Sequence, residues 1–252
     1  MAHPAESNWQ RLPLTGAYNV RDLGGYPVGM RQTKWHAFLR GDKLHDMTDE
    51  DCDFVYRYGV RTVIDLRSEA ETKRDPDRVC NEGSIAYVRA SLSDEDPEDP
   101  AIIKKLSEVV AEGNFTPKDI YVYYLENKSS IRTIFRAMAQ APENTAILFH
   151  CSDGKDRAGI ISMLLLMLAG VSRTDCIADY MASYPYCLGT EAGRKQWEEV
   201  PEAVRNLKDQ MLTTLGGFTY DWIEKHGGAR KFLETDCGIS AAELDRVVAR
   251  LV

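Results

Sequence analysis

The hydrophobic pattern is strongest over residues 145–169. Residues 145–149 form a short apolar run, and residues 160–168 are apolar on nearly every side of a helix. The pattern predicts a buried strand over 145–149 and a helix over 157–169. The polar residues between these two elements then form a tight turn from the end of a strand to the start of a helix.

Strand and helix patterns alternate along the rest of the chain. Thr48 and Asp51 predict a capped helix through residue 58. Strands are predicted at 18–20 (an edge strand), 36–40, 60–66 (a β-branched run typical of a buried parallel strand) and 85–90. Further helices are predicted at 101–112, 117–127, 130–140, from Ser172 or Thr174 to residue 183, and at 201–215, 218–225 and 240–252.

The alternation favours an α/β fold with a small, mainly parallel central sheet and helices on both faces. No repeat or domain-sized linker interrupts the pattern, so we expect a single domain over residues 1–252. The acidic, proline-containing segment 93–100 predicts a surface loop. The two helices that follow, within about 95–128, form either a lid beside the functional site or a plain helical hairpin.

Composition narrows the class of protein. Of 252 residues, 44% are hydrophobic and 28% are charged, which suits a folded domain with a sizeable core. The net charge of −8 argues against a general nucleic-acid-binding surface. The six cysteines and five histidines show no metal-ligand spacing, so we expect neither a metal nor a cofactor. A disulfide framework is not expected at this length.

Targeting signals are not evident in the sequence. The first seven residues contain no apolar core of a conventional signal peptide, and the apolar run 160–169 is too short to span a bilayer. We therefore expect no transmembrane segment and a cytoplasmic location by default, with secretion by another route left open. The sequence leaves the oligomeric state open.

The predicted turn at 150–157 contains residues suited to binding a phosphate group. Cys151 and Arg157 have the spacing Cys-x5-Arg, with Gly154 between them. Such a loop can direct its amides at a tetrahedral oxyanion, where the positive end of the helix dipole also favours negative charge. Arg157 can contact two phosphate oxygens at once, and the same field would stabilise Cys151 as a thiolate. The alternative, a buried structural cysteine, does not explain the charged residues beside it.

The sequence His-Cys-Ser-Asp-Gly-Lys-Asp-Arg-Ala-Gly at 150–159 resembles the signature of the cysteine-dependent protein and lipid phosphatases. Its Gly-Lys-Asp-Arg form is similar to the bacterial branch that includes the mycobacterial secreted tyrosine phosphatase B. The resemblance implies the cysteine-phosphatase fold. It extends along nearly the whole chain, through segments at 16–25, 38–41, 58–68, 178–180 and 227–228 and the final helix.

The resemblance and the residue chemistry together suggest a role for each loop residue. Cys151 would attack phosphorus to form a cysteinyl phosphate, and Arg157 would hold the equatorial oxygens. Asp156 would protonate the leaving oxygen, with Asp94 and Asp96 as alternative general acids in the acidic loop. The phosphate-binding residues would be Ser152, Asp153, Gly154, Lys155, Asp156 and Arg157, with His150, Asp22 and Arg67 in support.

Ala158 departs from the pattern of the family that the sequence resembles. Most members carry Thr or Ser directly after the arginine, and that hydroxyl hydrogen-bonds the cysteine sulfur as it leaves the phosphoenzyme. Alanine has no hydroxyl, so we expect slow hydrolysis of the cysteinyl phosphate.

The resulting functional hypothesis is a phosphomonoester hydrolase that acts on phosphotyrosine. Phosphoserine, phosphothreonine and phosphoinositides are further candidate substrates, because Lys155 adds a cationic charge to the loop. A phosphate-binding pseudophosphatase with little turnover is the alternative. Sulfur transfer and arsenate reduction fit less well, because of the length of the loop and its position in the chain.

Overall fold

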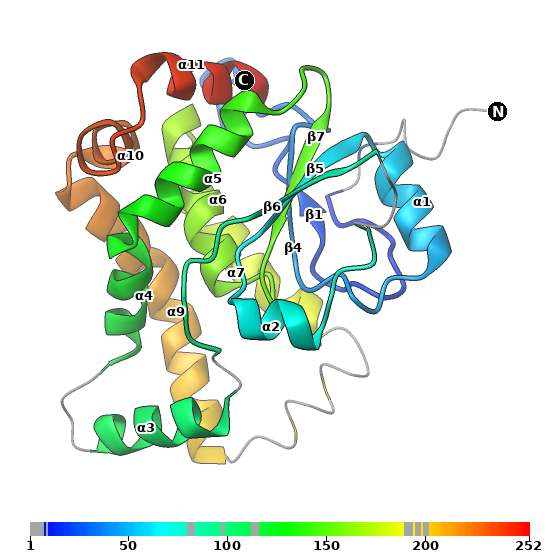
Figure 1. Cartoon of the computed structure of the whole chain (residues 1–252). Helices are drawn as coiled ribbons and strands as arrows, with labels where there is room; N and C mark the ends of the chain where they lie inside the picture. Colours follow the sequence, from blue (N-terminus) through cyan, green and yellow to red (C-terminus); the bar gives the residue numbers. More distant parts are fainter. Residues whose placement is uncertain are drawn as a thin grey trace.

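A five-stranded sheet forms the centre of the computed structural model (Figure 1). The structure describes residues 10–79, 84–96, 99–111, 116–188 and 202–252, together with residues 8, 194 and 198. The strand order is β1-β4-β7-β5-β6, in which β1 is antiparallel to β4 and the other neighbours are parallel. The sheet consists of β1 (Arg21–Asp22), β4 (Phe38–Gly41), β5 (Val60–Asp65), β6 (Ala86–Arg89) and β7 (Ala146–His150); β2 (Pro27–Val28) and β3 (Arg31–Gln32) form a separate antiparallel pair.

Helices cover both faces of this sheet. On one face, α1 and the segment before β1 pack around the apolar side chains of β4, β5 and β7. On the other face, α6 packs with α4, α5, α9 and α11 in the larger core (Figure 1). The helices are α1 (Asp49–Arg57), α2 (Glu69–Arg74), α3 (Pro100–Ala111), α4 (Pro117–Glu126), α5 (Lys128–Gln140), α6 (Asp156–Ala169), α7 (Arg173–Leu188), α9 (Glu202–Lys225), α10 (Gly228–Lys231), the π-helical turn η3 (Phe232–Asp236) and α11 (Ala241–Leu251).

The predicted α/β fold with a small, mainly parallel central sheet is confirmed. The strand-turn-helix unit lies at its centre, because β7 pairs with both β4 and β5 and leads directly into the turn before α6. Thr48 caps α1 in the predicted way, since its side chain accepts from the Asp51 N–H and the Asp51 carboxylate accepts from the Thr48 N–H. Within the described part of the chain, no helix is long and apolar enough to cross a membrane.

The edge strand predicted at 18–20 is wrong, because β1 comprises Arg21–Asp22 instead. The reason lies in the Asp42 carboxylate. It accepts hydrogen bonds from the N–H groups of Tyr18 (2.8 Å) and Asn19 (2.9 Å), so these amides are used outside a strand ladder. The segment before β1 is thus tied to the residue that directly follows β4.

The predicted break between helices at 215 and 218 is also wrong, since α9 runs continuously over Glu202–Lys225. Gly216 packs closely against α7 and does not end the helix. A Cβ atom at Gly216 would lie 2.9 Å from the Tyr180 ring. Of the predicted lid segment at about 95–128, residues 97, 98 and 112–115 lie outside the described residues, and α3 and α4 form most of the rest.

Candidate functional site

The turn between β7 and α6 packs directly against the end of β4. Gly154 has a positive φ of 65°, a conformation that favours glycine. A Cβ atom at this position would also lie 2.6 Å from the Gly41 carbonyl carbon and 2.7 Å from the Asp42 nitrogen. Gly154 therefore allows both the turn and its close approach to the neighbouring strand. We call residues 151–157 the phosphate loop.

Donors outside the phosphate loop bind its backbone carbonyls. The Lys43 N–H donates to the Ser152 carbonyl (3.0 Å), and the Asn19 side-chain amide donates to the Asp153 carbonyl (2.8 Å). Arg40 donates to the carbonyls of the next two residues, Gly154 (2.7 Å) and Lys155 (3.1 Å). The backbone carbonyls of the phosphate loop thus accept hydrogen bonds from residues outside the loop. This arrangement suits a loop whose backbone N–H groups bind an anion.

A buried cluster of charges fixes Arg40 behind the phosphate loop. Arg40 and Arg21 both pair with Asp179 of α7, at 2.5 Å and 3.2 Å. Arg21 also donates to the Ser183 hydroxyl on the same helix (2.8 Å). All three charged side chains are at most 1% exposed, so removal of one would leave an uncompensated buried charge. The helix α7 thus holds the phosphate loop through Arg40.

Arg157 is held by Glu71, a residue that the sequence analysis did not identify. Its two terminal nitrogens donate to the two Glu71 carboxylate oxygens at 2.7 Å and 2.8 Å. The Ser152 hydroxyl also donates to Glu71 and lies 3.2 Å from Arg157. Burial alone would raise the pKa of Glu71, but the hydrogen bonds and charge of Arg157 lower it to about 2. The guanidinium is therefore oriented by an ionised carboxylate at the edge of the phosphate loop.

A sequence signal for Glu71 does exist. Ser68 and Glu71 form the capping box of α2, the Ser-x-x-Glu pattern of a helix start. The sequence analysis predicts no helix between the strands at 60–66 and 85–90, so it misses α2. The same carboxylate that caps α2 through the Ser68 N–H (2.9 Å) binds Arg157.

Cys151 directly follows β7 and is only 2% exposed. Its burial raises the pKa of the thiol, while the Arg157 guanidinium and the Ala158 N–H lower it. Asp153 and Asp156 raise it further, and the net pKa lies above the ordinary value. The predicted depressed pKa is therefore wrong for this structure. Burial outweighs the local positive charge, and Arg157 shares that charge with the Glu71 carboxylate.

His150 and Arg67 belong to a buried ion network on the strand side of Cys151. His150 Nε2 lies 2.9 Å from Asp77 Oδ2 and 3.7 Å from Asp65 Oδ1. Arg67 pairs with both carboxylates at 2.9 Å. The two acids and His150 are close enough together to hold a metal ion. The Arg67 guanidinium already bridges both carboxylates, however, and would repel a cation there. We interpret the network as support for the end of β7.

Asp156 is the first residue of α6, and its carboxylate contacts one side chain of the phosphate loop and one of α4. Lys155 Nζ lies 3.4 Å from Asp156 Oδ1. The Tyr121 hydroxyl on α4 donates to the same oxygen, and the Tyr180 hydroxyl on α7 lies 2.5 Å from that of Tyr121. Neither tyrosine was identified from the sequence, because they are distant in the chain from Asp156 and from each other.

The remaining predicted residues have other contacts. Asp22 accepts from the N–H groups of Gly24 and His36 (2.8 Å each) and from the Tyr58 hydroxyl (2.9 Å), so it braces the turn after β1. Burial raises its pKa to about 6. Asp94 is exposed, as expected of an acidic surface loop.

Asp96 departs from the expected solvated loop. Its carboxylate accepts a hydrogen bond from Arg74 at the end of α2, and the side chain is only 10% exposed. The acidic loop is thus attached to α2, the helix that carries Glu71.

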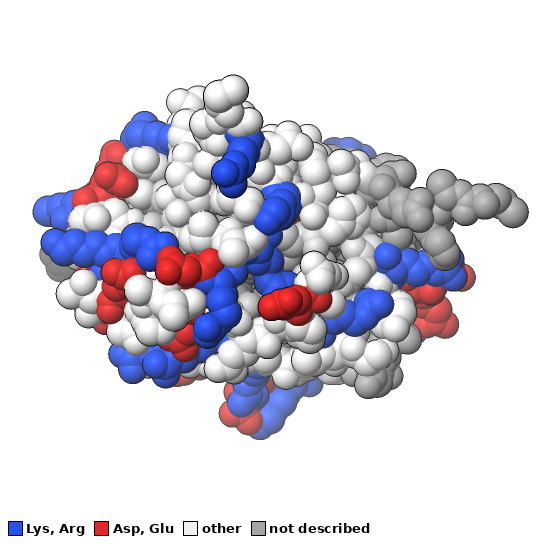
Figure 2. Space-filling model, turned by 90° about the horizontal axis from the view of Figure 1, so that it is seen from above, with Lys and Arg blue, Asp and Glu red and all other residues white. Residues whose placement is uncertain are grey.

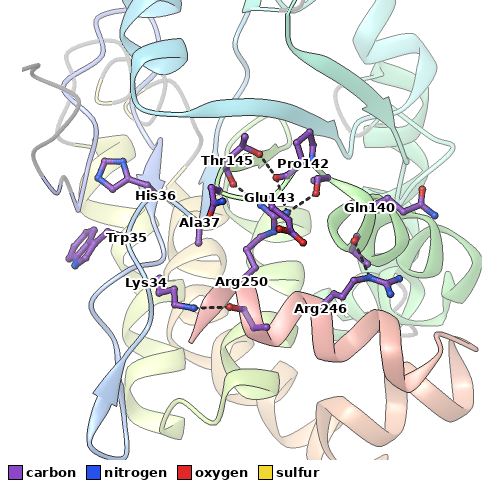
Figure 3. A pocket seen from close by; sticks show the side chains of 14 residues that line it. Lys34, Trp35, His36, Ala37, Gln140, Pro142, Glu143, Thr145, Arg246 and Arg250 are labelled. Atoms are coloured by element: carbon purple, nitrogen blue, oxygen red, sulfur yellow. Dashed lines mark hydrogen bonds between the residues drawn. The ribbon is translucent and has the colours of Figure 1, made fainter.

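A separate pocket of about 770 Å³ lies at the opposite end of β7 (Figure 3). It is lined by the turn before β7, by the segment before β4 and by α11. Its cationic side chains already bind backbone carbonyls: Lys34 donates to Ala249 (2.7 Å), and Arg250 donates to Thr145 (2.7 Å) and Ala141 (2.8 Å). On this face of the molecule, Lys and Arg are interspersed with Asp and Glu (Figure 2). The cations therefore fasten α11 to the core.

The sequence of this chain is similar to those of known phosphatases. Residues 12–252 match the model of the tyrosine phosphatase family. A tyrosine-protein phosphatase of Nostoc commune is 34% identical over 154 residues, covering 61% of this chain and 50% of that protein. The triple specificity protein phosphatase PtpB of Mycobacterium tuberculosis is 25% identical over 269 residues, covering 93% and 96%. A putative tyrosine-protein phosphatase of Cupriavidus necator is 26% identical over 171 residues, covering 66% and 60%. The match thus spans half of the Nostoc protein.

Proposed function

Because the chain belongs to the tyrosine phosphatase family, we propose that it hydrolyses phosphomonoesters through a cysteinyl phosphate on Cys151. The observation that carries this proposal is the phosphate loop itself. It joins the central strand to α6, contains Cys151 and holds Arg157 against Glu71. A thiol, a guanidinium and a helix N-terminus in one loop provide a nucleophile and an anion site together.

In the first proposed step, the Cys151 sulfur attacks phosphorus as a thiolate. The S–P bond forms while the bond from phosphorus to the leaving oxygen breaks, and Asp156 gives its proton to that oxygen. Burial raises the pKa of the thiol, so the sulfur must first lose its proton, either to solvent or to a phosphate oxygen of the substrate. Arg157 offsets the charge that spreads over the equatorial oxygens.

In the second proposed step, water attacks the phosphorus of the cysteinyl phosphate. The Asp156 carboxylate takes a proton from this water, inorganic phosphate forms and the sulfur departs as a thiolate. The Ala158 N–H hydrogen-bonds Cys151, so the departing sulfur has one backbone donor. The hydroxyl that Thr or Ser would add at this position is absent, and we expect this step to be the slower one.

For the substrate, we propose phosphotyrosine in the first place. The support is the family match and the position of two tyrosines of α4 beside the phosphate loop: the Tyr121 hydroxyl donates to Asp156, and Tyr124 lies near Arg157 and Cys151. The name of the mycobacterial relative, a triple specificity protein phosphatase, motivates phosphoserine and phosphothreonine as further candidates. Phosphoinositides are also candidate substrates, because the Lys155 ammonium adds a cation to the phosphate loop.

Hydrolysis of p-nitrophenyl phosphate by wild type and Cys151→Ser tests the proposal. We expect turnover in wild type, none in Cys151→Ser, and retained phosphate affinity in the variant because Arg157 and the amides remain. Cys176→Ser is a matched control, since Cys176 is equally buried but lies on α7. Phosphate binding by the wild type without turnover would instead identify a pseudophosphatase. Substantial activity in Cys151→Ser would contradict the covalent route.

A further inference from the structure

A chain of hydroxyl groups connects the side chain of Asp156 to two helices outside the phosphate loop. The Tyr121 hydroxyl of α4 donates to Asp156 Oδ1. The Tyr180 hydroxyl of α7 lies 2.5 Å from the Tyr121 hydroxyl. Both tyrosines are only 2% exposed, so water does not replace these partners easily. The contacts therefore determine how the carboxyl group is oriented.

The direction of each hydrogen bond follows from counting protons. A tyrosine hydroxyl has one hydrogen, and Tyr121 uses it for Asp156. The Tyr180 hydroxyl must then donate to the Tyr121 oxygen. Burial, followed by the charge of Asp156, raises the pKa of Tyr121 well above its usual value, which keeps the hydroxyl protonated as a donor. Consecutive hydrogen bonds of this kind polarise and strengthen each other.

Asp156 Oδ1 thus receives two donors, the Tyr121 hydroxyl and the Lys155 ammonium at 3.4 Å. A carboxyl oxygen that accepts hydrogen bonds from both is a poor place for the acidic proton. The proton of a neutral Asp156 then belongs on Oδ2, where the leaving group could take it.

Helix α7 supports both the backbone before Asp156 and the carboxyl group of Asp156. Asp179 of α7 holds Arg40, which binds the carbonyls of Gly154 and Lys155, while the adjacent Tyr180 supports Tyr121. Gly159 allows this approach, because a Cβ atom there would lie 2.9 Å from the Tyr180 ring. The backbone before Asp156 and the carboxyl group of Asp156 are therefore both positioned from α7.

We propose that Tyr121, supported by Tyr180, is a positioning residue that orients Asp156 and assigns its acidic proton to Oδ2. In the first chemical step this proton passes from Oδ2 to the leaving oxygen as the S–P bond forms and the P–O bond breaks. The resulting carboxylate keeps the Tyr121 hydrogen bond and takes a proton from water in the second step. This inference rests on the proposed function, because it requires Asp156 to be the general acid.

The test is the dependence of kcat/KM on the leaving group for Tyr121→Phe, Tyr180→Phe and Asp156→Asn. An alkyl phosphate needs the proton, whereas p-nitrophenolate leaves almost without it. We expect Tyr121→Phe to lower kcat/KM for the alkyl phosphate about 10- to 100-fold, as for a lost hydrogen bond to a charged group. The loss for p-nitrophenyl phosphate should be much smaller, and Tyr180→Phe should show a weaker form of the same pattern. A purely structural role would lower both activities equally.

Tyr123→Phe is the matched control, because Tyr123 lies on α4 but is 48% exposed. Tyr121→Phe in the Asp156→Asn background should cause no additional selective loss. This inference would be overturned if Tyr121→Phe kept the wild-type leaving-group dependence or gained alkyl phosphatase activity. A selective loss in Asp156→Asn in the same experiment would still support Asp156 as the general acid. If Asp156→Asn itself shows the wild-type dependence, both the acid assignment and this inference are wrong.

Discussion

At the scale of single residues, the sequence identified the groups that carry the proposed chemistry but not those that orient them. Cys151, Asp156 and Arg157 lie within seven consecutive residues, so one local motif reveals them. Glu71 and Tyr121 reach the loop only through the packing of α2 and α4. The spacing of residues along the chain does not predict such contacts. The thiol pKa was predicted in the wrong direction for the same reason, since burial is a property of the whole fold.

Glu71 gives the sharpest prediction at this scale. In Glu71→Gln the bidentate contact with Arg157 is lost, so the guanidinium is no longer fixed and phosphate binding weakens. We expect kcat/KM for p-nitrophenyl phosphate to fall about 10- to 100-fold, the usual effect of a lost hydrogen bond to a charged group. Steady-state kinetics and inhibition by inorganic phosphate measure this effect.

Glu69→Gln provides the control for Glu71→Gln. Glu69 lies on the same short helix, but its side chain is 58% exposed and pairs with Lys73. This variant should keep the wild-type kcat/KM. Equal losses in both variants would show that the charge of α2, and not the contact with Arg157, sets phosphate affinity.

At the scale of elements, continuous apolar runs predicted the central strand and α6 well, and alternating apolar and polar positions predicted α11. The short helix α2 was missed because its six residues contain no apolar stripe. The break predicted between the helices at 201–215 and 218–225 falls at Gly216 and Gly217, whereas Gly216 allows α9 to pack against Tyr180. Glycine marks either a turn or a close contact, and only the packing distinguishes the two.

The N-cap of α2 connects stability to the site. In Ser68→Ala the hydroxyl that accepts from the Glu71 N–H is lost. We expect unfolding to become easier by about 1 kcal/mol. We also expect lower kcat/KM, because the cap helps to place Glu71 beside Arg157. Denaturant unfolding and steady-state kinetics measure the two effects.

Ser240→Ala removes an equivalent capping box at α11, away from the phosphate loop. It should lower stability by a similar amount and leave kcat/KM unchanged. If Ser68→Ala affects stability alone, the cap of α2 does not position Glu71.

At the scale of the whole molecule, the fold places buried charges around the carboxyl end of β7. Sequence pattern predicted the sheet and the end at which the site lies, following the general rule for open α/β sheets. It did not predict the networks of Asp65, Asp77, Arg67 and His150, or of Arg21, Arg40 and Asp179. Each network joins segments that are far apart in the chain, residues 65–77 with His150 in the first and residues 21–40 with Asp179 in the second.

His150 should make stability depend on pH. Burial lowers its pKa, but Asp77 and then Asp65 outweigh this and raise it above the unfolded value of about 6.5. The stabilisation is therefore complete below about pH 6.5 and is lost as pH rises through the folded pKa. We expect the free energy of unfolding of wild type to fall over this range relative to His150→Gln. The same comparison with His45→Gln is the control, and an equal pH dependence of wild type and His150→Gln would contradict the prediction.

The central claim is that Cys151 carries the phosphoryl group between two chemical steps. The most direct measurement is rapid acid quenching of wild type during turnover of p-nitrophenyl phosphate, followed by mass spectrometry of the peptide that contains residues 150–157. We expect a peptide heavier by one phosphoryl group on Cys151, and accumulation of this species because hydrolysis of the intermediate is slow with alanine at position 158. Active enzyme with unmodified Cys151, or with the phosphoryl group on another residue, would show that Cys151 does not carry the phosphoryl group.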